Sequence, residues 1–307
     1  MTSQLINADI PAPNESLLGY LRRLGDLNFY TDTSSFMCSI GVTFGRQLVE
    51  EIDGLAAILG VSANSLLEIA PSAKSDGLLQ WAFQRRKADP ICPLCIAEGR
   101  PHHQSWQHAL VASCPLHDLL LQTHCDICGQ ERTFRSGGWK TCTCGTSLTR
   151  FKHEPAPAIV RVVSKLISGM EITGDISRLP PSFRGGHTIP DLARFLFFLA
   201  TSANPSRTGK DGKTPIPKTV TEAVDMLANA EEILLDWPHG FDALVQNRIE
   251  ISRNEQPSMR ARLGRWHERL IEFTAPQYQD FHAHIDHLSK QRMRRPRPIG
   301  IFLAGVG

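Results

Sequence analysis

Apolar residues in the first ninety positions recur at the spacing of short amphipathic helices. The first helix follows Asn14 and Ser16, either of which can cap its first turn. Leucines mark it at i, i+1, i+4 and i+7: Leu17, Leu18, Leu21 and Leu24. A second helix is expected over residues 46–59, where Gly60 ends it. Ser62 then caps a third helix. Helix, glycine turn and capped helix in this order is typical of a helix-turn-helix unit.

The exposed face of that third helix limits what such a unit can bind. Its first turn offers Asn64 and Ser65 as candidate nucleic-acid contacts but no Lys or Arg, which weakens the case for direct recognition of bases. Residues 78–90 are expected to form a strand-containing connection. It holds a basic triplet that is a second candidate, for contact with phosphates: Arg85, Arg86 and Lys87. For the helix-turn-helix-like unit the alternative is a small helical protein-binding domain, and for the basic triplet it is a solvated loop.

The second half of the chain has a helical pattern that indicates no particular chemical function. A linker around Pro155 and Pro157 leads into it, and residues 202–218 are loop-like. Helices are expected at 159–167, 190–201, 220–235, 239–249, 259–273 and from Pro276 onward. The basic tail begins at Lys290 and supplies a third set of candidate nucleic-acid contacts: Arg292, Arg294, Arg295 and Arg297. A solvated helix end and an acidic partner are the alternatives for this tail.

Composition excludes several classes of protein. The 307 residues include 41% hydrophobic side chains, an ordinary globular share that argues against disorder throughout. No apolar run approaches the roughly 20 residues that span a bilayer, and the N-terminus lacks the pattern of a signal peptide. We therefore expect a cytoplasmic protein with no membrane partner. The net charge of +2 argues against strong binding of naked DNA by charge alone.

The placement of the cysteines indicates metal binding. Seven of the eight lie between Cys92 and Cys144, whereas disulfide frameworks belong to short secreted chains. Two Cys-x2-Cys pairs, one Cys-x2-His and one Cys-x-Cys divide into two sites of four ligands: Cys92, Cys95, Cys114 and His117, then Cys125, Cys128, Cys142 and Cys144. Closed sites of four ligands are structural, because catalytic zinc keeps one position for water. The sequence therefore predicts two structural zinc ions.

Some details of these sites stay open at this point. The two sites can interleave their ligands, and an iron–sulfur cluster is a minority interpretation. Four histidines are substitute ligands: His102, His103, His108 and His124. Gly129 and Gly145 each follow a ligand and permit the tight turn of a zinc knuckle. Cys38 stands alone on an apolar stretch and is expected to be a small buried hydrophobic residue.

These patterns together predict a mainly α fold with small β elements of the zinc-ribbon or knuckle type. The expected domains are a helical N-terminal domain with the helix-turn-helix-like unit over 1–89, a two-site zinc module over 90–153, and a helical domain with the basic tail over 154–307.

The order of several short motifs resembles the TniQ/TnsD family of transposon target-selection proteins. The resemblance covers about residues 10–150. It rests on Pro13-x-Glu15-Ser16-Leu-Leu-x-Tyr-Leu-Arg22-Arg23-Leu-x-x-Leu-Asn28, Cys92-Pro-x-Cys95, Trp106, Cys114-Pro-x-His117 and Cys125-x-x-Cys128-Gly129. A weaker similarity to the family's helical C-terminal part lies in Asp236-Trp237-Pro238-x-Gly-Phe241. Asp126, where the family usually has Pro, and the final Cys-x-Cys pair depart from the pattern, which affects the second site more than the first.

The resemblance implies a non-catalytic adaptor of DNA transposition. Such a protein binds target DNA, or a guide-RNA complex already on DNA as in CRISPR-associated transposons, and recruits an AAA+ ATPase that brings in the transposase. It implies zinc-ligand roles for the eight matched positions. The expected partners are thus the ATPase regulator, target DNA, a guide-RNA effector complex and a second copy in a homodimer. The alternative is a zinc-stabilised helix-turn-helix transcription regulator that binds DNA directly.

Two further motifs suggest enzymes and do not hold. His282-Ala-His284-Ile-Asp286-His287 matches a string of metallo-hydrolases, but apolar residues at i, i+3, i+7 and i+10 from Tyr278 predict an ordinary amphipathic helix with the histidines on its polar side. The segment Gly209–Thr214 lacks the first glycine of a P-loop, since Arg207 occupies that position. A zinc hydrolase that uses the C-terminal histidines stays as a third hypothesis.

Overall fold

Helices account for most of the fold. The computed structural model describes residues 7–43, 48, 51–71, 83–85, 88–133, 135, 137–172, 179–184, 188–202, 216–251 and 259–294. The described chain divides into two compact units. Unit 1 contains residues 1–174 and 188–231, and unit 2 contains residues 175–187 and 232–307. The mainly helical fold is confirmed, while the three-domain division of the chain stays a prediction.

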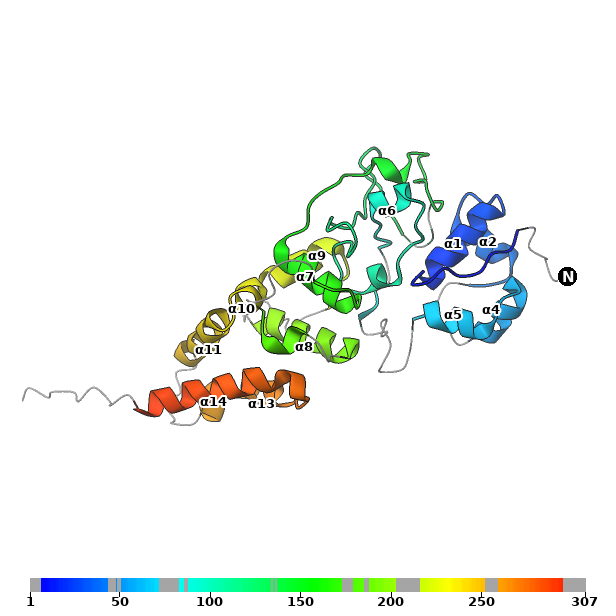
Figure 1. Cartoon of the computed structure of the whole chain (residues 1–307). Helices are drawn as coiled ribbons and strands as arrows, with labels where there is room; N and C mark the ends of the chain where they lie inside the picture. Colours follow the sequence, from blue (N-terminus) through cyan, green and yellow to red (C-terminus); the bar gives the residue numbers. More distant parts are fainter. Residues whose placement is uncertain are drawn as a thin grey trace, which may run out of the picture. The chain divides into compact units, whose positions relative to one another are not determined.

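Four helices at the N-terminal end of unit 1 share one hydrophobic core: α1 (Leu17–Leu27), α2 (Thr33–Ser39), α4 (Ile52–Leu59) and α5 (Ala63–Ile69) (Figure 1). Ser16 caps α1 by accepting a hydrogen bond from the Gly19 amide, as the sequence predicts. The predicted second helix begins at Ile52 in the described part, and residues 44–47 lie outside it. Helix α2 has a local signal that sequence reasoning missed, since Asp32 accepts a bond from the Ser35 amide.

Helices α4 and α5 have the geometry of a helix-turn-helix unit. Gly60 ends α4 in the left-handed conformation with φ 69°, which suits a residue without Cβ. Ser62 caps α5, and the chain bends by 116° between the two helices, close to the angle of helix-turn-helix pairs. The predicted pattern of helix, glycine turn and capped helix is therefore present.

The cysteine-rich part of unit 1 consists of turns around one short helix. Helix α6 (Pro93–Ala97) and the 3-10 segments η2 (Gln104–Gln107) and η3 (Leu148–Arg150) are its helical elements (Figure 1). Within the described residues its β structure consists of isolated antiparallel bridges, such as Ile91 with Gln122 and Thr141 with Ser147. Helices α7 (Ala158–Ile167), α8 (Ile189–Ser202) and α9 (Val220–Ala228) complete unit 1, with the start of α10 (Glu231–Leu235).

Unit 2 is helical as well. It contains η4 (Pro181–Arg184), most of α10, α11 (His239–Ile251), α12 (Met259–Leu263), α13 (Arg265–Ile271), η6 (Pro276–Tyr278) and α14 (Gln279–Arg294). Two predicted helices are each divided in two. The expected helix 220–235 breaks after the C-cap Asn229, and the expected helix 259–273 breaks at Gly264, whose φ is 53°.

Candidate metal centres

The first cluster of ligands is assembled by α6 and one tight turn. Cys92 is the N-cap of α6 and Cys95 lies within it, while Cys114 and His117 lie on the turn that follows η2. The Nδ1 atom of His117 is 3.4 Å from the Sγ of Cys92, 3.3 Å from that of Cys95 and 3.5 Å from that of Cys114. The two sulfurs of Cys95 and Cys114 are 3.6 Å apart.

These distances fit a tetrahedral metal site. Zn–S bonds near 2.3 Å and Zn–N bonds near 2.0 Å at tetrahedral angles place ligand atoms about 3.8 Å apart for two sulfurs and about 3.5 Å apart for sulfur and nitrogen. All four ligand atoms lie within 4.8 Å of one another, and the three cysteines are buried. A donor set of three thiolates and one imidazole suits zinc better than an iron–sulfur cluster.

The second cluster has four sulfurs and is more open to solvent. The Sγ atoms of Cys125 and Cys144 are 3.8 Å apart, and so are those of Cys128 and Cys142. Cys125 is buried, but Cys128 and Cys144 are exposed. The two groups have the ligands that the spacing predicts, and neither interleaves with the other.

Each pair of ligands is followed by a residue in the left-handed conformation. These residues are Gly99, Asp118, Gly129 and Gly145, with φ values of 71°, 55°, 68° and 83°. Gly129 donates to the Cys125 carbonyl over 2.8 Å and Gly145 to the Cys142 carbonyl over 2.9 Å, so each turn closes on its own first ligand. The predicted role of the two glycines is confirmed.

Outer partners fix the ligands of the first cluster. The Nε2 of His117 lies 2.9 Å from a carboxylate oxygen of Glu98, a contact that orients the imidazole and leaves Nδ1 for the metal. The adjacent Arg100, and then His117, lower the pKa of Glu98, which keeps this carboxyl ionised. Asp118, the residue after His117, forms an ion pair of 2.9 Å with Lys165 on α7.

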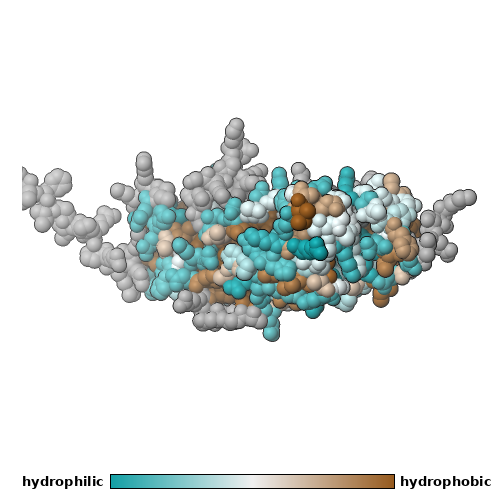
Figure 2. Space-filling model, turned by 90° about the horizontal axis from the view of Figure 1, so that it is seen from above, coloured by the Kyte–Doolittle hydropathy of each residue, from teal (hydrophilic) through white to brown (hydrophobic). Residues whose placement is uncertain are grey.

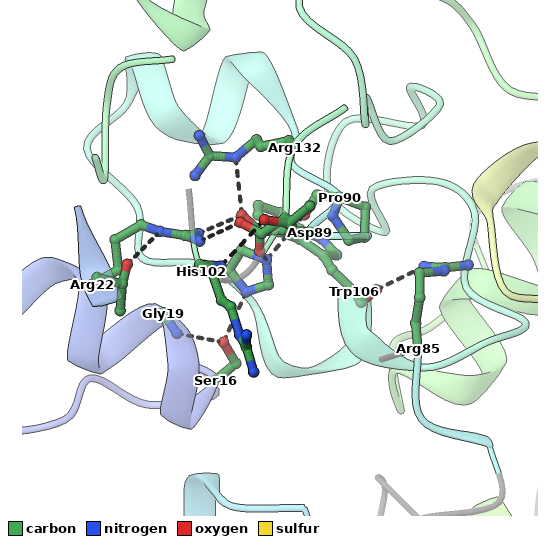
Figure 3. Close-up of polar contacts among 12 residues, drawn as sticks. Ser16, Gly19, Arg22, Arg85, Asp89, Pro90, His102, Trp106 and Arg132 are labelled. Atoms are coloured by element: carbon green, nitrogen blue, oxygen red, sulfur yellow. Dashed lines mark hydrogen bonds and ion pairs between the residues drawn. The ribbon is translucent and has the colours of Figure 1, made fainter. Parts of the chain in front are cut away.

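A buried ion-pair network ties α1 to the cysteine-rich part of the chain (Figure 3). Asp89, only 1% exposed, pairs with Arg22 of α1 and lies 2.9 Å from the Nε of Arg132 and 3.1 Å from the Nε2 of His102. Burial opposes the ionisation of Asp89, but Arg22, Arg132 and His102 outweigh it and hold the pKa of this carboxyl well below its usual range. Asp89 therefore remains a carboxylate that joins three segments of the chain.

Comparison with known families identifies the part of the chain that contains Arg22, Asp89 and His102 of this network. The TniQ family model matches residues 9–121. The chain contains a TniQ domain. This confirms the resemblance predicted from the sequence motifs, and TniQ domains belong to non-catalytic target-selection adaptors of transposition. The match includes the first metal cluster and ends before the second. No curated protein matches the chain.

The charged residues of the TniQ motif have structural roles in this domain. Arg23 forms a two-pronged ion pair with the fully buried Glu15, with N–O distances of 2.9 and 2.8 Å. Ser16 both caps α1 and contacts Nδ1 of His102 over 2.8 Å. Arg22 binds Asp89, as described above. The motif therefore fastens α1 to the segment before Cys92, a function that sequence spacing could not show.

One predicted nucleic-acid contact is wrong. Arg85 is fully buried, and its guanidinium donates to the backbone carbonyls of Trp106, Ala109 and Val111 at 2.9 to 3.3 Å (Figure 3). Burial lowers the pKa of Arg85 to about 10. A side chain that satisfies carbonyls inside the TniQ domain cannot reach a phosphate at its surface. Its neighbours Arg86 and Lys87 lie outside the described residues.

The remaining predicted contacts that the structure describes belong to separate elements. Asn64 is exposed on α5, while the hydroxyl of Ser65 bonds with that of its neighbour Ser62 at 2.7 Å. Arg292 and Arg294 belong to the last turns of α14 in unit 2, and Arg295 and Arg297 lie outside the described residues. Their roles in binding nucleic acid stay predictions.

The substitute histidines have other partners. His102 belongs to the Asp89 network, and His103 accepts a bond from the Ser105 amide. His108 stacks on Phe83, and burial lowers its pKa to about 3. His124 lies 3.0 Å from the hydroxyl of Thr123. None of the four joins a metal-ligand cluster of the described residues.

Two other predictions are decided by burial. His282, His284 and His287 of the C-terminal motif lie on α14. Phe281 and Ile285 form the buried side of this helix, as the helical pattern predicts. Cys38 is exposed, so its predicted burial is wrong.

In the described part of the chain no single helix is long and apolar enough to cross a membrane, although the bent pair α4 and α5 together meets the length and composition criteria.

Proposed function

We propose that this protein is a non-catalytic adaptor that selects the target site in DNA transposition. It links target DNA, or a recognition complex that includes guide RNA, to an AAA+ ATPase regulator and through it to the transposase. The TniQ match over residues 9–121 carries this proposal. The buried network of ion pairs gives these charged residues a structural role, because they hold α1 to the cysteine-rich part of the chain.

The two metal clusters take zinc in this proposal. A bound zinc ion would cross-link the turns around each cluster, and the ligands Cys92, Cys95, Cys114 and His117 would hold the segment that follows Asp89. Both clusters supply four protein ligands and leave no position for a substrate. The free thiolates that such sites need persist in a reducing compartment, which supports a cytoplasmic location.

An insertion assay tests the proposal. A cell that carries the transposon ends, transposase, ATPase regulator and this protein should insert at the selected target, and deletion of this protein should abolish that selection. Cys92→Ser should lose both selection and one bound metal ion. Cys38→Ser is the matched control, because Cys38 is exposed and belongs to neither cluster. Target selection that persists without the protein, or a failure of the purified protein to bind the regulator, would refute the adaptor role.

The geometry of α4 and α5 favours one alternative function, a zinc-stabilised transcription regulator. The 116° bend and the capped second helix suit insertion into a major groove. A regulator of this kind binds a specific duplex alone, with affinity in the nanomolar range at physiological salt. An adaptor needs its partner complex for the same selectivity. Binding of the purified protein to its own promoter region, measured by fluorescence anisotropy, separates the two.

A further inference from the structure

We call α1, α2, α4 and α5 the N-terminal helix group, because these helices share one hydrophobic core. The group includes the helix-turn-helix-like unit. One attachment of the group to the rest of unit 1 lies at the start of α1. There the Ser16 amide donates to the His102 carbonyl over 2.8 Å, and the Gln104 amide donates to the Asn14 carbonyl over 2.7 Å. All four residues lie within the matched TniQ domain, so this first attachment belongs to the domain itself.

A second attachment lies farther along α1 and uses the chain between the two ligand pairs of the second cluster. We call residues 129–133, 135 and 137–141 the second-cluster loop. The guanidinium of Arg22 donates to the Thr133 carbonyl over 3.1 Å, and the Ser34 hydroxyl of α2 donates to the Arg135 carbonyl over 3.3 Å. The loop therefore contacts both α1 and α2, although it lies beyond the residues that the TniQ family model matches.

Arg132 connects the second-cluster loop to the buried Asp89 (Figure 3). Its Nε lies 2.9 Å from Asp89, and its other two guanidinium nitrogens donate to the carbonyls of Gly138 over 3.2 Å and Thr141 over 3.5 Å. The Asp89 amide in turn donates to the Arg132 carbonyl over 3.0 Å. One buried side chain thus joins both arms of the loop to the carboxylate that pairs with Arg22.

The second cluster stands where the two arms of the loop meet. Its ligands flank the loop in pairs: Cys125 and Cys128 before it, Cys142 and Cys144 after it. In two cases a sulfur of one pair lies 3.8 Å from a sulfur of the other, so one metal ion can bridge the arms. The Thr143 hydroxyl also donates to Gln130 across the arms over 2.7 Å, but this bond is exposed and water competes for it. A bound ion would be a much stronger cross-link than this hydrogen bond.

The second cluster is also the more accessible of the two clusters. Cys128 and Cys144 are exposed, whereas the three cysteines of the first cluster are buried. Ile127, beside Cys128, is 74% exposed and adds to the hydrophobic areas of a mainly hydrophilic surface, of which Figure 2 shows one face. Solvent and chelators therefore reach an ion in the second cluster more readily than one in the first.

We propose that a metal ion in the second cluster controls the second attachment of the N-terminal helix group. With the ion bound, the closed loop keeps Arg132 on Asp89 and holds α2 and the second half of α1. When the ion leaves, the arms separate, Arg132 loses the carbonyls of Gly138 and Thr141, and the second attachment weakens. The first attachment, at the start of α1, remains. The helix-turn-helix-like unit is then held less firmly on the rest of unit 1. This inference rests on the zinc assignment made under the proposed function.

Hydrogen exchange at single amides of the full-length, metal-loaded protein tests this control. Cys144→Ser removes an exposed ligand, so the variant should hold one zinc ion per chain. The amides of Asp89, which bonds to the loop, and of Leu24, in the second half of α1, should then exchange at least about tenfold faster. The Ser16 amide of the first attachment should exchange within twofold of the wild type. Cys38→Ser is the matched control, because this exposed cysteine belongs to neither cluster and its loss should change nothing.

A chelator provides a second measurement that needs no substitution. Removal of the second ion from the wild-type protein should accelerate exchange at the same two amides, Asp89 and Leu24. Addition of zinc should restore their protection, because the four ligands are then intact.

The outcomes separate this inference from the proposed function. Loss of the second ion with exchange at Asp89 and Leu24 still within twofold of the wild type overturns the inference. Equal acceleration at Ser16 overturns it as well, because the ion would then support the whole domain rather than one attachment. Wild-type protein that holds an ion in the first cluster only overturns both the inference and the zinc assignment of the second cluster. That result leaves the adaptor role intact, which the insertion assay tests independently.

Discussion

Substitution of Asp89 by Asn tests whether the buried network holds α1 against the cysteine-rich segment. The variant keeps the shape of the side chain and removes its charge. Arg22 and Arg132, 3% and 4% exposed, then face each other across a neutral amide inside the protein. Removing one partner of a buried ion pair generally costs about 3–5 kcal/mol, because the remaining charge is left uncompensated. Some hydrogen bonds of the arginines to carbonyls persist, so we expect a loss near the lower end of this range, about 3 kcal/mol.

Hydrogen exchange measures this loss where it should appear. The amides of Leu21 and Leu24 in the middle of α1 should exchange faster in the metal-loaded Asp89→Asn variant. A loss of about 3 kcal/mol corresponds to a fall in protection of more than about a hundredfold, since about 1.4 kcal/mol is a factor of ten. Arg194→Met is the control, because the ion pair of Arg194 with Asp191 is exposed and should contribute at most about 1 kcal/mol.

A double variant examines the cause. Addition of Arg132→Met to Asp89→Asn removes one of the two uncompensated cations, so the pair should be less destabilised than the sum of the single changes. The explanation would be wrong if Asp89→Asn lowered protection no more than Arg194→Met does. It would also be wrong if the two substitutions were additive, because the network would then contribute no coupling between α1 and the segment after Cys128.

Three further predictions follow from individual contacts. Metal analysis should find two zinc ions per chain, and a chelator should remove the ion of the more exposed second cluster first; iron, or one ion only, would contradict the assignment. Because burial lowers the pKa of His108 to about 3, its neutral form stabilises the fold fully above about pH 6.5 and this contribution is lost as the pH falls toward 3. His108→Phe should therefore lose less stability between pH 6.5 and pH 5 in thermal melts, by up to about 1.4 kcal/mol per pH unit; an unchanged slope would show that another group is responsible. Gly240→Ala should lower the melting temperature, because the new Cβ would lie 1.8 Å from the Glu232 carbonyl oxygen, whereas the helical and unobstructed Gly54→Ala should gain about 0.5–1 kcal/mol.

Local patterns were sufficient for most of the helices and for the metal ligands. The caps at Ser16 and Ser62 and the turn at Gly60 act within a few residues of themselves, so the sequence alone specifies them. Cysteine pairs with two residues between them likewise form one turn whatever the rest of the fold does. The helix breaks at Asn229 and Gly264 were missed because the apolar periodicity continues through them.

The TniQ motif shows where local pattern stops being informative. Its Glu15, Arg22 and Arg23 are charged residues at the start of the chain, and by sequence alone they are as suited to a surface as to a core. The structure buries all three, because each finds a partner of opposite charge at close range. Asp89, the partner of Arg22, lies 67 residues away and belongs to no spacing rule.

The sequence by itself determined which eight residues can hold two metal ions and where most helices lie, because these depend on short-range geometry. Only the tertiary structure decided which charges are buried and which are available. Arg85, read from the sequence as a surface cation, fills the interior by satisfying three carbonyls, while Phe29, an apolar residue, is held in solvent at the end of α1. Burial depends on contacts between segments far apart in the chain. A cation can be buried where such contacts supply its hydrogen-bond partners, and an aromatic ring stays exposed where they supply none.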